Sequence, residues 1–313
     1  MSEKDIATFF RQPISSKKII SLLMKNHSIK TTQKKEVSLN GTCDSRNGGH
    51  RKLVFSYEKN LKSFENLTDS FIIIDKTPEP DQQNNNIFCE AQDPKAAFID
   101  LLQAIISEVG LDAHSYNFTQ NASVSKNSEI ASTAFIESGV EIGDGSIIGD
   151  GAVIKKGTYI GKNTVIGENT VLGSYGINLY KAKDGSLIKF PHVGGVYIGD
   201  NSEIGANCVV VGGILSPTTI GNNVIIGNLC NIGHSVIIGD SVWMSVGSLV
   251  GGHTTIQTEA TIAMGVKIRD NVEIGSEASI GMGSVVVKGV NPRHSVFGNP
   301  AKRTTNIKAG PRR

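Results

Sequence analysis

The chain has 313 residues, a formal net charge of +2 and four cysteines. A charge this close to neutral argues against a nucleic-acid partner, and no stretch reaches the ~20 apolar residues of a membrane-spanning helix, which argues against integral membrane association. The cysteines show neither CxxC nor other metal-ligand spacing, and the acidic N-terminus lacks the apolar core of a secretory signal. Composition therefore predicts a cytoplasmic protein with no metal and room for about two domains.

The first part of the chain, residues 1–115, predicts a small α/β domain that we expect to bind a nucleotide sugar. Ser16 is the expected cap of a helix over Lys17–Lys25. A second helix is expected to start at Asp93-Pro94, after which apolar residues recur at helical spacing. β-Branched and aromatic residues predict strands at 52–57 and 71–75.

An aliphatic residue then returns at every sixth position, in three runs between Val124 and Val286. Small and polar residues fill the other positions, as expected for very short strands joined by tight turns. Three such hexads close one coil of about eighteen residues with the aliphatic residue inward, and the coils stack into a solenoid. The predicted fold is mainly β: a parallel β-helix of hexapeptide repeats over 116–290, preceded by the α/β domain and followed by a tail at 291–313.

Two interruptions break this six-residue register. The first is a loop at 173–197, and the second adds four residues at about Gly212–Thr218. An insertion in a solenoid must loop outward, where binding functions are often found. The alternative is that these loops only brace a neighbouring subunit.

The outer faces are predicted to carry apolar residues that a monomer would expose, namely Val209, Val211, Val236 and Val242. Packing against identical copies would cover them, and a cyclic arrangement suits a three-sided prism. We therefore expect a homotrimer.

His234 is the candidate general base, because it lies two residues after the inward Ile232 and is therefore expected near a turn. A surface histidine without function is the alternative. Gly252 follows eighteen residues later, one coil on, and its N–H is the candidate donor to the oxyanion of an acyl-transfer intermediate. The adjacent His253 is expected to contact the acyl donor or simply to be exposed.

The repeat, the segment NIGHSVIIGD around His234 and the ending GSVVVKGVNPRHSVFGNPAKR together resemble the hexapeptide-repeat acyltransferases. The resemblance implies a left-handed parallel β-helix. The ending is similar to that of sugar acetyltransferases, in which a GNPAK-like segment, here Gly298–Lys302, lies near the adenine end of acetyl-CoA. The residues expected to bind this cofactor are Gly252, His253, Gly265, Gly283, Asn299, Pro300 and Lys302.

The domain order and the insertion also resemble the UDP-3-O-(3-hydroxyacyl)glucosamine N-acyltransferases of lipid A synthesis. This resemblance implies that His234 is the catalytic base, that aromatic residues of the N-terminal domain help to hold the nucleotide, and that an acyl carrier protein is the donor. Phe55 or Tyr57 is the aromatic candidate here, with core packing as the alternative for Phe55. From the loop, Asn178, Lys189 and His192 are expected to contact the substrate.

Two departures from the lipid A enzymes bear on this expectation. They have an acidic residue seven places before the histidine, where this chain has Gly227 followed by Asn228. They also end in a longer helical extension that meets the carrier protein. The shorter ending here favours a CoA thioester as donor.

The sequence thus favours an N-acyltransferase that moves an acetyl group from acetyl-CoA to the amine of a nucleotide-linked amino sugar, for surface polysaccharide or glycan synthesis. The first alternative is a lipid A N-acyltransferase that takes a 3-hydroxyacyl group from acyl carrier protein. An O-acetyltransferase, a structural scaffold and a zinc-dependent γ-class carbonic anhydrase are further alternatives. The HxxxxH spacing of the γ-class carbonic anhydrases is absent from this sequence.

Overall fold

The computed structural model describes residues 8–32, 35–43, 48–57, 66–79, 85–112 and 122–304. The chain divides into two compact units. Unit 1 comprises Met1–Tyr116 and Ile177–Val193, and unit 2 comprises Asn117–Gly176 and Gly194–Arg313. Most of the first register interruption therefore folds with the N-terminal part of the chain and not with the solenoid.

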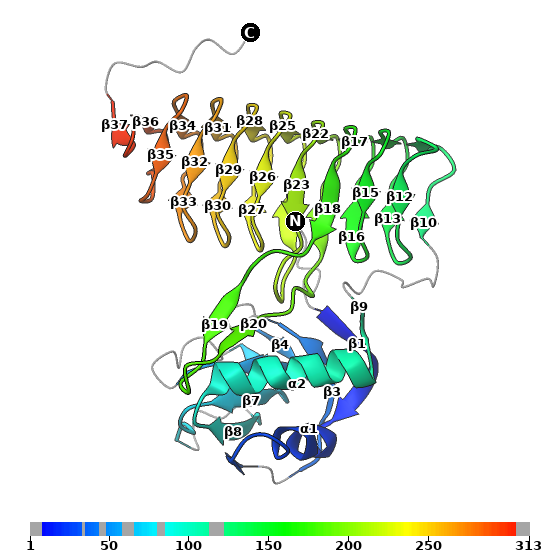
Figure 1. Ribbon diagram of the computed structural model, residues 1–313, viewed down its shortest axis with the longest axis vertical. Helices are drawn as coiled ribbons and strands as arrows, with labels where there is room; N and C mark the ends of the chain where they lie inside the picture. The colour runs from blue at the N-terminus through cyan, green and yellow to red at the C-terminus, as the bar shows by residue number, and fades with distance from the viewer. Residues whose placement is uncertain are drawn as a thin grey trace. The chain divides into compact units, whose positions relative to one another are not determined.

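In its described residues, unit 1 contains a mixed seven-stranded sheet of order β2-β8-β7-β5-β3-β1-β9 and two helices (Figure 1). The helices are α1 (Ser16–Leu23) and α2 (Pro94–Glu108). The strands of this sheet are β1 (Thr8–Ser15), β2 (Ile29–Thr31), β3 (Ser38–Thr42), β5 (Lys52–Phe55), β7 (Phe71–Ile74), β8 (Ile87–Ala91) and β9 (Leu111–Asp112). Two pairs complete the unit: β4 (Gly49–His50) with β6 (Leu67–Thr68), and the inserted hairpin β19 (Leu179–Lys181) with β20 (Leu187–Lys189).

The two helix starts differ in how well they were predicted. Asp93 caps α2 as expected, since its Oδ1 accepts a hydrogen bond from Ala96 N at 3.1 Å. The cap of α1 is Ser15 and not Ser16, because Ser15 Oγ accepts from Lys18 N at 3.2 Å. Ser16 is buried and its hydroxyl accepts from Val37 N at 3.1 Å instead. Either of two adjacent serines could cap the helix. Because the hydroxyl of Ser16 is engaged by Val37, Ser15 is the capping residue.

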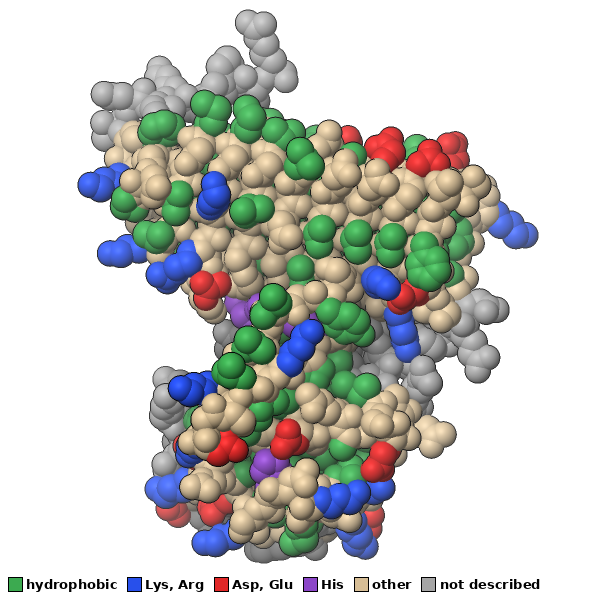
Figure 2. Space-filling view, viewed as in Figure 1, with side chains coloured by type: hydrophobic (Ala, Val, Ile, Leu, Met, Phe, Trp, Pro, Cys, Tyr) green, Lys and Arg blue, Asp and Glu red, His purple; other side chains and the backbone are tan. Residues whose placement is uncertain are grey.

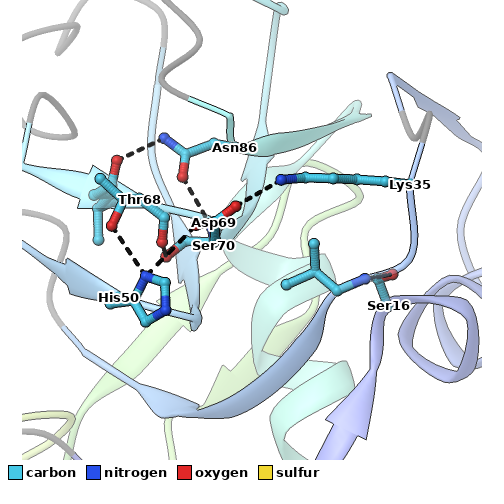
Figure 3. A network of polar contacts seen from close by, with 9 residues as sticks. Ser16, Lys35, His50, Thr68, Asp69, Ser70 and Asn86 are labelled. Atoms are coloured by element: carbon cyan, nitrogen blue, oxygen red, sulfur yellow. Dashed lines mark hydrogen bonds and ion pairs between the residues drawn. The ribbon is translucent and has the colours of Figure 1, made fainter.

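A polar network surrounds the β4–β6 pair (Figure 3). Lys35 Nζ lies 2.6 Å from Asp69 Oδ1, and His50 Nδ1 lies 3.2 Å from Thr68 Oγ1. The hydrogen bond from Lys35 lowers the pKa of Asp69. Asn86, which is buried, donates to a backbone carbonyl of β6 at 2.9 Å. These contacts satisfy the polar groups where the chain leaves the sheet.

Unit 2 is a parallel β-solenoid with three faces (Figure 1). Face 1 consists of β10 (Ser123–Val124), β13 (Glu141–Ile142), β16 (Thr158–Ile160), β21 (Val196–Ile198), β24 (Thr218–Ile220), β27 (Ile237–Ile238), β30 (Thr255–Ile256) and β33 (Glu273–Ile274). Face 2 consists of β11 (Glu129–Ile130), β14 (Ile147–Ile148), β17 (Val165–Ile166), β22 (Glu203–Ile204), β25 (Ile225–Ile226), β28 (Trp243–Met244), β31 (Thr261–Ile262), β34 (Ser279–Ile280), β36 (Ser295–Phe297) and β37 (Lys302–Arg303). Face 3 consists of β12 (Phe135–Ile136), β15 (Val153–Ile154), β18 (Val171–Ser174), β23 (Val209–Val211), β26 (Asn231–Ile232), β29 (Leu249–Val250), β32 (Lys267–Ile268) and β35 (Val285–Val286).

The repeated aliphatic residues form the solenoid core, as the six-residue register predicted. Ile142 pairs with Ile160, one eighteen-residue coil apart, and this register recurs around the prism. Every repeated residue from Ile142 to Val286 is buried, whereas Val124 in the first coil is 39% exposed. Coils bury each other's inward residues, so the first described coil is covered on one side only.

The prediction for the outer faces was wrong in detail. Val236 and Val242 are buried, as is Val211, and only Val209 is partly exposed. Val236 and Val242 stand two residues before an inward aliphatic, and alternation in a strand puts residues i and i+2 on the same side. The exposed apolar residues of the strands stand one place before the inward aliphatic residue; they include Phe135, Ile225, Ile237, Trp243 and Leu249. Hydrophobic side chains of this kind form rows on the visible face of the solenoid (Figure 2).

Candidate active site

The imidazole of His234 lies against the backbone of Gly252. A Cβ added at Gly252 would stand 2.4 Å from Cε1, 2.6 Å from Nε2 and 2.8 Å from Nδ1 of the ring. Real Cβ atoms do not approach other atoms so closely. With the ring in this position, only glycine fits at 252, and the structure brings together the two residues predicted to be catalytic.

Register explains this juxtaposition. Ile232 pairs with Val250, so the turns that follow β26 and β29 stack on each other. Both turns lie at corner 3–1, which we define as the edge where the chain passes from face 3 to face 1. His253 N donates to His234 O at 2.9 Å, and the two imidazole centroids are 4.9 Å apart in an edge-on arrangement. His253 adopts a left-handed backbone with φ of 57°, as turn residues do.

The N–H of Gly252 suits an oxyanion donor. In the described part of the chain it donates no hydrogen bond. A Cβ at Gly233 would lie 2.7 Å from this nitrogen, so a side chain at position 233 would crowd it. Two glycines therefore keep one backbone donor uncrowded next to an imidazole, which is what stabilising an oxyanion beside a general base requires.

The environment of His234 favours its neutral form. Burial lowers the pKa of the imidazole below its usual 6.5, while a hydrogen bond with its own backbone and the charge of Asp270 act in the opposite direction. A neutral imidazole accepts a proton, so the residue is available as a base near neutral pH.

Both register interruptions leave the solenoid at the corner that carries His234. The first follows β18 and the second follows β23, and both rejoin the solenoid on face 1. The second is fastened to the His234 turn, since Ser235 Oγ accepts from Ile214 N at 3.1 Å and Ser235 N donates to Thr218 Oγ1 at 2.9 Å. Sequence reasoning located the two breaks, but it did not identify Ser235 or the shared corner.

In unit 1, aromatic rings join the inserted segment to the sheet and to α2. The centroids of Phe55 and Phe98 are 5.0 Å apart, and Phe190 lies 6.2 Å from Phe55 and 6.0 Å from Phe98. Phe98 and Phe190 are buried, whereas Phe55 is partly exposed. Phe55 thus packs against two buried rings while part of its own surface stays exposed.

The tip of the hairpin is held by the carboxylate that caps α2. Tyr180 Oη donates to Asp93 Oδ1 at 2.8 Å, and Lys183 N donates to Asp93 Oδ2 at 3.0 Å. Burial opposes ionisation of Asp93, but these donors and the Ala96 N–H together hold its pKa below the usual value. Tyr57 hydrogen-bonds to Tyr180, and burial raises the pKa of the Tyr57 phenol.

A cation completes this cluster. Lys95 Nζ lies 4.9 Å from the Tyr180 ring centroid and 5.7 Å from that of Phe190. Burial lowers the pKa of this lysine, and Asp93 partly offsets the effect. Sequence reasoning missed Asp93, Lys95 and Tyr180 as site candidates, because their partners are about ninety residues apart in the chain.

The three loop residues predicted to contact substrate belong to the inserted segment or to its return toward the solenoid. The carbonyl of Asn178 accepts from Phe190 N at 2.8 Å, and that of Lys189 accepts from Gln103 Nε2 at 3.2 Å. The Lys189 residue is exposed and His192 is buried. The described residues include no group of three His, Cys, Asp or Glu side chains arranged for a metal ion.

Comparison with known proteins agrees with the architecture. The family description "Bacterial transferase hexapeptide (six repeats)" matches residues 139–174, and the same three-sided coil continues as far as Val286. Over residues 139–174 the chain resembles that family. No helix in its described ranges has the length and apolar character needed to cross a membrane.

Named proteins to which this chain is similar are acyltransferases. Over 75 residues it is 45% identical to UDP-3-O-acylglucosamine N-acyltransferase of Shewanella denitrificans, a match that covers 24% of this chain and 22% of that protein. The chain thus spans about a fifth of the curated relative's length. The structure of UDP-N-acetylglucosamine acyltransferase from Campylobacter jejuni has a TM-score of 0.51 and 21% identity, over 59% of this chain and 73% of that one, which shows the fold. The structure of the Francisella novicida enzyme of the same name has a TM-score of 0.49 and 27% identity, over 60% of this chain and 69% of that one.

The remaining predicted cofactor residues lie at a different edge, corner 2–3, where the chain passes from face 2 to face 3. Gly265 and Gly283 occupy equivalent turns there, with φ of 69° and 68°. The segment that contains Asn299, Pro300 and Lys302 folds beside them, since Gly298 N donates to Ser284 Oγ at 3.0 Å and Ala301 N donates to Val285 O at 2.8 Å. Lys302 is exposed. A single chain therefore presents the His234 group and the Lys302 group at separate corners.

Proposed function

We propose that this protein is an N-acyltransferase that transfers an acyl group from a thioester to the amine of a nucleotide-linked amino sugar. The observation that carries the proposal is the imidazole of His234 lying against the Gly252 backbone, where a base and an oxyanion donor stand side by side. The names of the related acyltransferases support the same reaction class.

In the proposed reaction, the amine nitrogen attacks the thioester carbonyl carbon while His234 takes the proton that the amine releases. The oxyanion of the tetrahedral intermediate accepts a hydrogen bond from Gly252 N–H. When the carbon–sulfur bond breaks, the leaving thiolate takes the proton from the imidazolium, which returns His234 to its neutral form. The lowered pKa of His234 suits this cycle, because the resting base is unprotonated near neutral pH.

The proposed acceptor is a UDP-linked sugar, in line with the name of the Shewanella denitrificans protein. The cluster of Tyr57, Tyr180, Asp93 and Lys95 in unit 1 offers aromatic rings, a carboxylate and a cation for a nucleotide. We propose that the nucleotide binds at this cluster, with Phe55 as part of its wall and Asn178, Lys189 and His192 as flanking residues.

The proposed donor is an acyl-CoA, with acetyl-CoA favoured by the Gly298–Lys302 segment beside Gly283. The second candidate is a longer acyl group carried by acyl carrier protein, which the name of the N-acyltransferase relative favours because its acceptor is an acylated UDP-sugar. In both cases His253, next to Gly252, would face the donor.

We further propose that the active protein is a homotrimer. Corner 3–1 carries His234 and corner 2–3 carries Lys302, so a neighbouring copy is needed to bring the two groups to one site. Assembly would also cover exposed apolar residues such as Ile225, Ile237 and Trp243, each nearly half exposed in one chain.

A donor and acceptor screen tests this proposal. Purified protein is incubated with UDP- or dTDP-linked amino sugars and with acetyl-CoA or 3-hydroxyacyl-acyl carrier protein, and the products are weighed by mass spectrometry. An acetyl adduct on the sugar amine supports the CoA donor, and a hydroxyacyl adduct supports the carrier protein. The N-acyltransferase proposal is wrong if no combination gives an N-acylated sugar while both ligands raise the thermal midpoint of the protein.

A further inference from the structure

The lipid A enzymes that this chain resembles have an acidic residue seven places before the histidine, and Gly227 stands there in this chain. Gly227 and Asn228, which occupy the region of that acid, lie in the turn after β25, at corner 2–3 and not at corner 3–1. The side chain of Asn228 is used locally, since its Oδ1 accepts from Ala206 N at 2.9 Å. A carboxylate that acts on His234 within unit 2 must therefore come from another turn.

Asp270 occupies the equivalent turn position in the same column. Val250 pairs with Ile268, as Ile232 pairs with Val250, so His234, Gly252 and Asp270 follow one another along corner 3–1. The backbone contacts along this column are close: Asn271 N donates to Gly252 O at 3.0 Å, and a Cβ at Gly251 would stand 2.4 Å from Asp270 N.

Gly252 separates His234 from Asp270 in this column and has no side chain of its own. The His234 ring occupies the place that a side chain at 252 would fill, so the next side chain along this column is that of Asp270. The carboxylate of Asp270 is held in its turn, because Asn271 Nδ2 donates to Asp270 Oδ2 at 2.8 Å. From these contacts we propose that Asp270 is a positioning residue that stabilises the imidazolium form of His234 during acyl transfer, in place of the missing acid. This inference rests on the proposed function.

Other charged or titratable groups near this column could act on His234 instead of Asp270. The turn after β23, residues 212–217, contributes none. The turns that follow His234 along the corner contribute His253, Arg269 and, one coil beyond Asp270, Lys288. His253 contacts the His234 ring edge-on and is the main competitor as a partner. Among these residues, Asp270 is the only one that can carry a negative charge, and its charge opposes the effect of burial on the pKa of His234.

The test compares Asp270→Asn with Asp270→Glu and with a matched control, Asp240→Asn. Asp240 lies in a turn between face 1 and face 2 and accepts from Asn222 N at 2.7 Å, so it is a turn aspartate away from His234. The pKa of His234 is measured in each full-length protein by NMR with labelled histidine, assigned through His234→Gln, and kcat/KM is measured against pH.

We expect Asp270→Asn to lower the pKa of His234, to move the acid limb of the rate profile to lower pH, and to reduce kcat by about two- to tenfold. Asp270→Glu should keep the pKa of His234 and kcat close to their wild-type values, and Asp240→Asn should change neither quantity. High salt should reduce the pKa difference between wild type and Asp270→Asn, because Asp270 is exposed. An unchanged His234 pKa in Asp270→Asn overturns the inference, as does a shift that His253→Gln causes and Asp270→Asn does not. The NMR result can be obtained whether or not transfer activity is found, so it fails separately from the proposed function. A His234→Ala protein with normal turnover would overturn the assignment of His234 as the base, and with it the role of Asp270 in transfer, but would leave the measured effect of Asp270 on the pKa of His234 intact.

Discussion

The ring of His234 occupies the space in which a side chain at Gly252 would lie, with 2.4 Å between the added Cβ and Cε1. Gly252→Ala should therefore displace the imidazole. Because the clash is with the movable end of a side chain and Gly252 does not have a positive φ, the fold should survive. We expect kcat to fall at least about tenfold, as when a base is moved from its place, with a small change in thermal midpoint. Unchanged kcat would contradict the arrangement.

A double variant tests the origin of that effect. In His234→Ala/Gly252→Ala the clash is gone, so any stability lost in Gly252→Ala should return, which a thermal denaturation cycle measures. Gly247→Ala is the contrast: its φ is 70° with open space around the added Cβ, so it should cost about 1 kcal/mol from backbone strain alone, whatever stands at position 234. Additive losses for His234 and Gly252 would argue against their contact.

The pH dependence of transfer follows from the pKa of His234. Burial holds this pKa below 6.5, and the neutral ring is the active form. Activity should therefore reach its plateau by neutral pH and be lost as the pH falls through the lowered pKa. The measurement is kcat/KM against pH with wild-type protein. An acid limb centred at or above pH 6.5 would contradict a buried neutral base.

Complementation tests whether the site is shared between copies. His234→Ala and Lys302→Ala each remove one proposed part of the site, at corners 3–1 and 2–3. If a site takes its histidine from one copy and its lysine from the next, random 1:1 mixed trimers should regain about a quarter of the wild-type sites. Activity no higher than that of the separate variants, in a preparation shown to contain mixed trimers, would mean that the two residues do not act across an interface.

The hairpin contact in unit 1 predicts a stability effect. Tyr180→Phe removes the hydroxyl that donates to Asp93 at 2.8 Å and leaves a partly buried carboxylate with one donor fewer. We expect the free energy of unfolding to fall by about 1–3 kcal/mol, with faster proteolysis at residues 182–186. Tyr175→Phe is the control, since Tyr175 is 77% exposed. Equal losses in both variants would argue against the Asp93 contact.

The solenoid could be predicted from the sequence because each coil repeats the same short pattern of residues. One inward aliphatic every six residues is enough to set the coil, and its burial from Ile142 onward agrees with that rule. Val236 and Val242 were predicted to lie on the outer faces, but they are buried. The six-residue period alone does not show which neighbours of an inward residue also point inward; the alternation of side chains along a strand decides this.

The candidate site was readable only in part, and for the same reason. His234 and Gly252 are one coil apart, so the eighteen-residue period links them. The contact of Tyr180 with Asp93 joins an insertion to a helix cap 87 residues earlier, and no local pattern encodes it. The separation of Lys302 from His234 likewise depends on the corner at which each turn lies. That corner cannot be assigned from the sequence until it is known where the chain rejoins the solenoid after each register break.

The most direct test of the central claim is a comparison of wild type, His234→Ala and the control His50→Ala in one transfer assay. Formation of N-acylated nucleotide sugar is followed by mass spectrometry with the donor that the wild type uses. We expect His234→Ala to lose about a hundredfold or more in kcat while remaining folded, as for removal of a general base, and His50→Ala, which alters an exposed network in unit 1, to keep its activity. Near-normal turnover by His234→Ala would contradict the account.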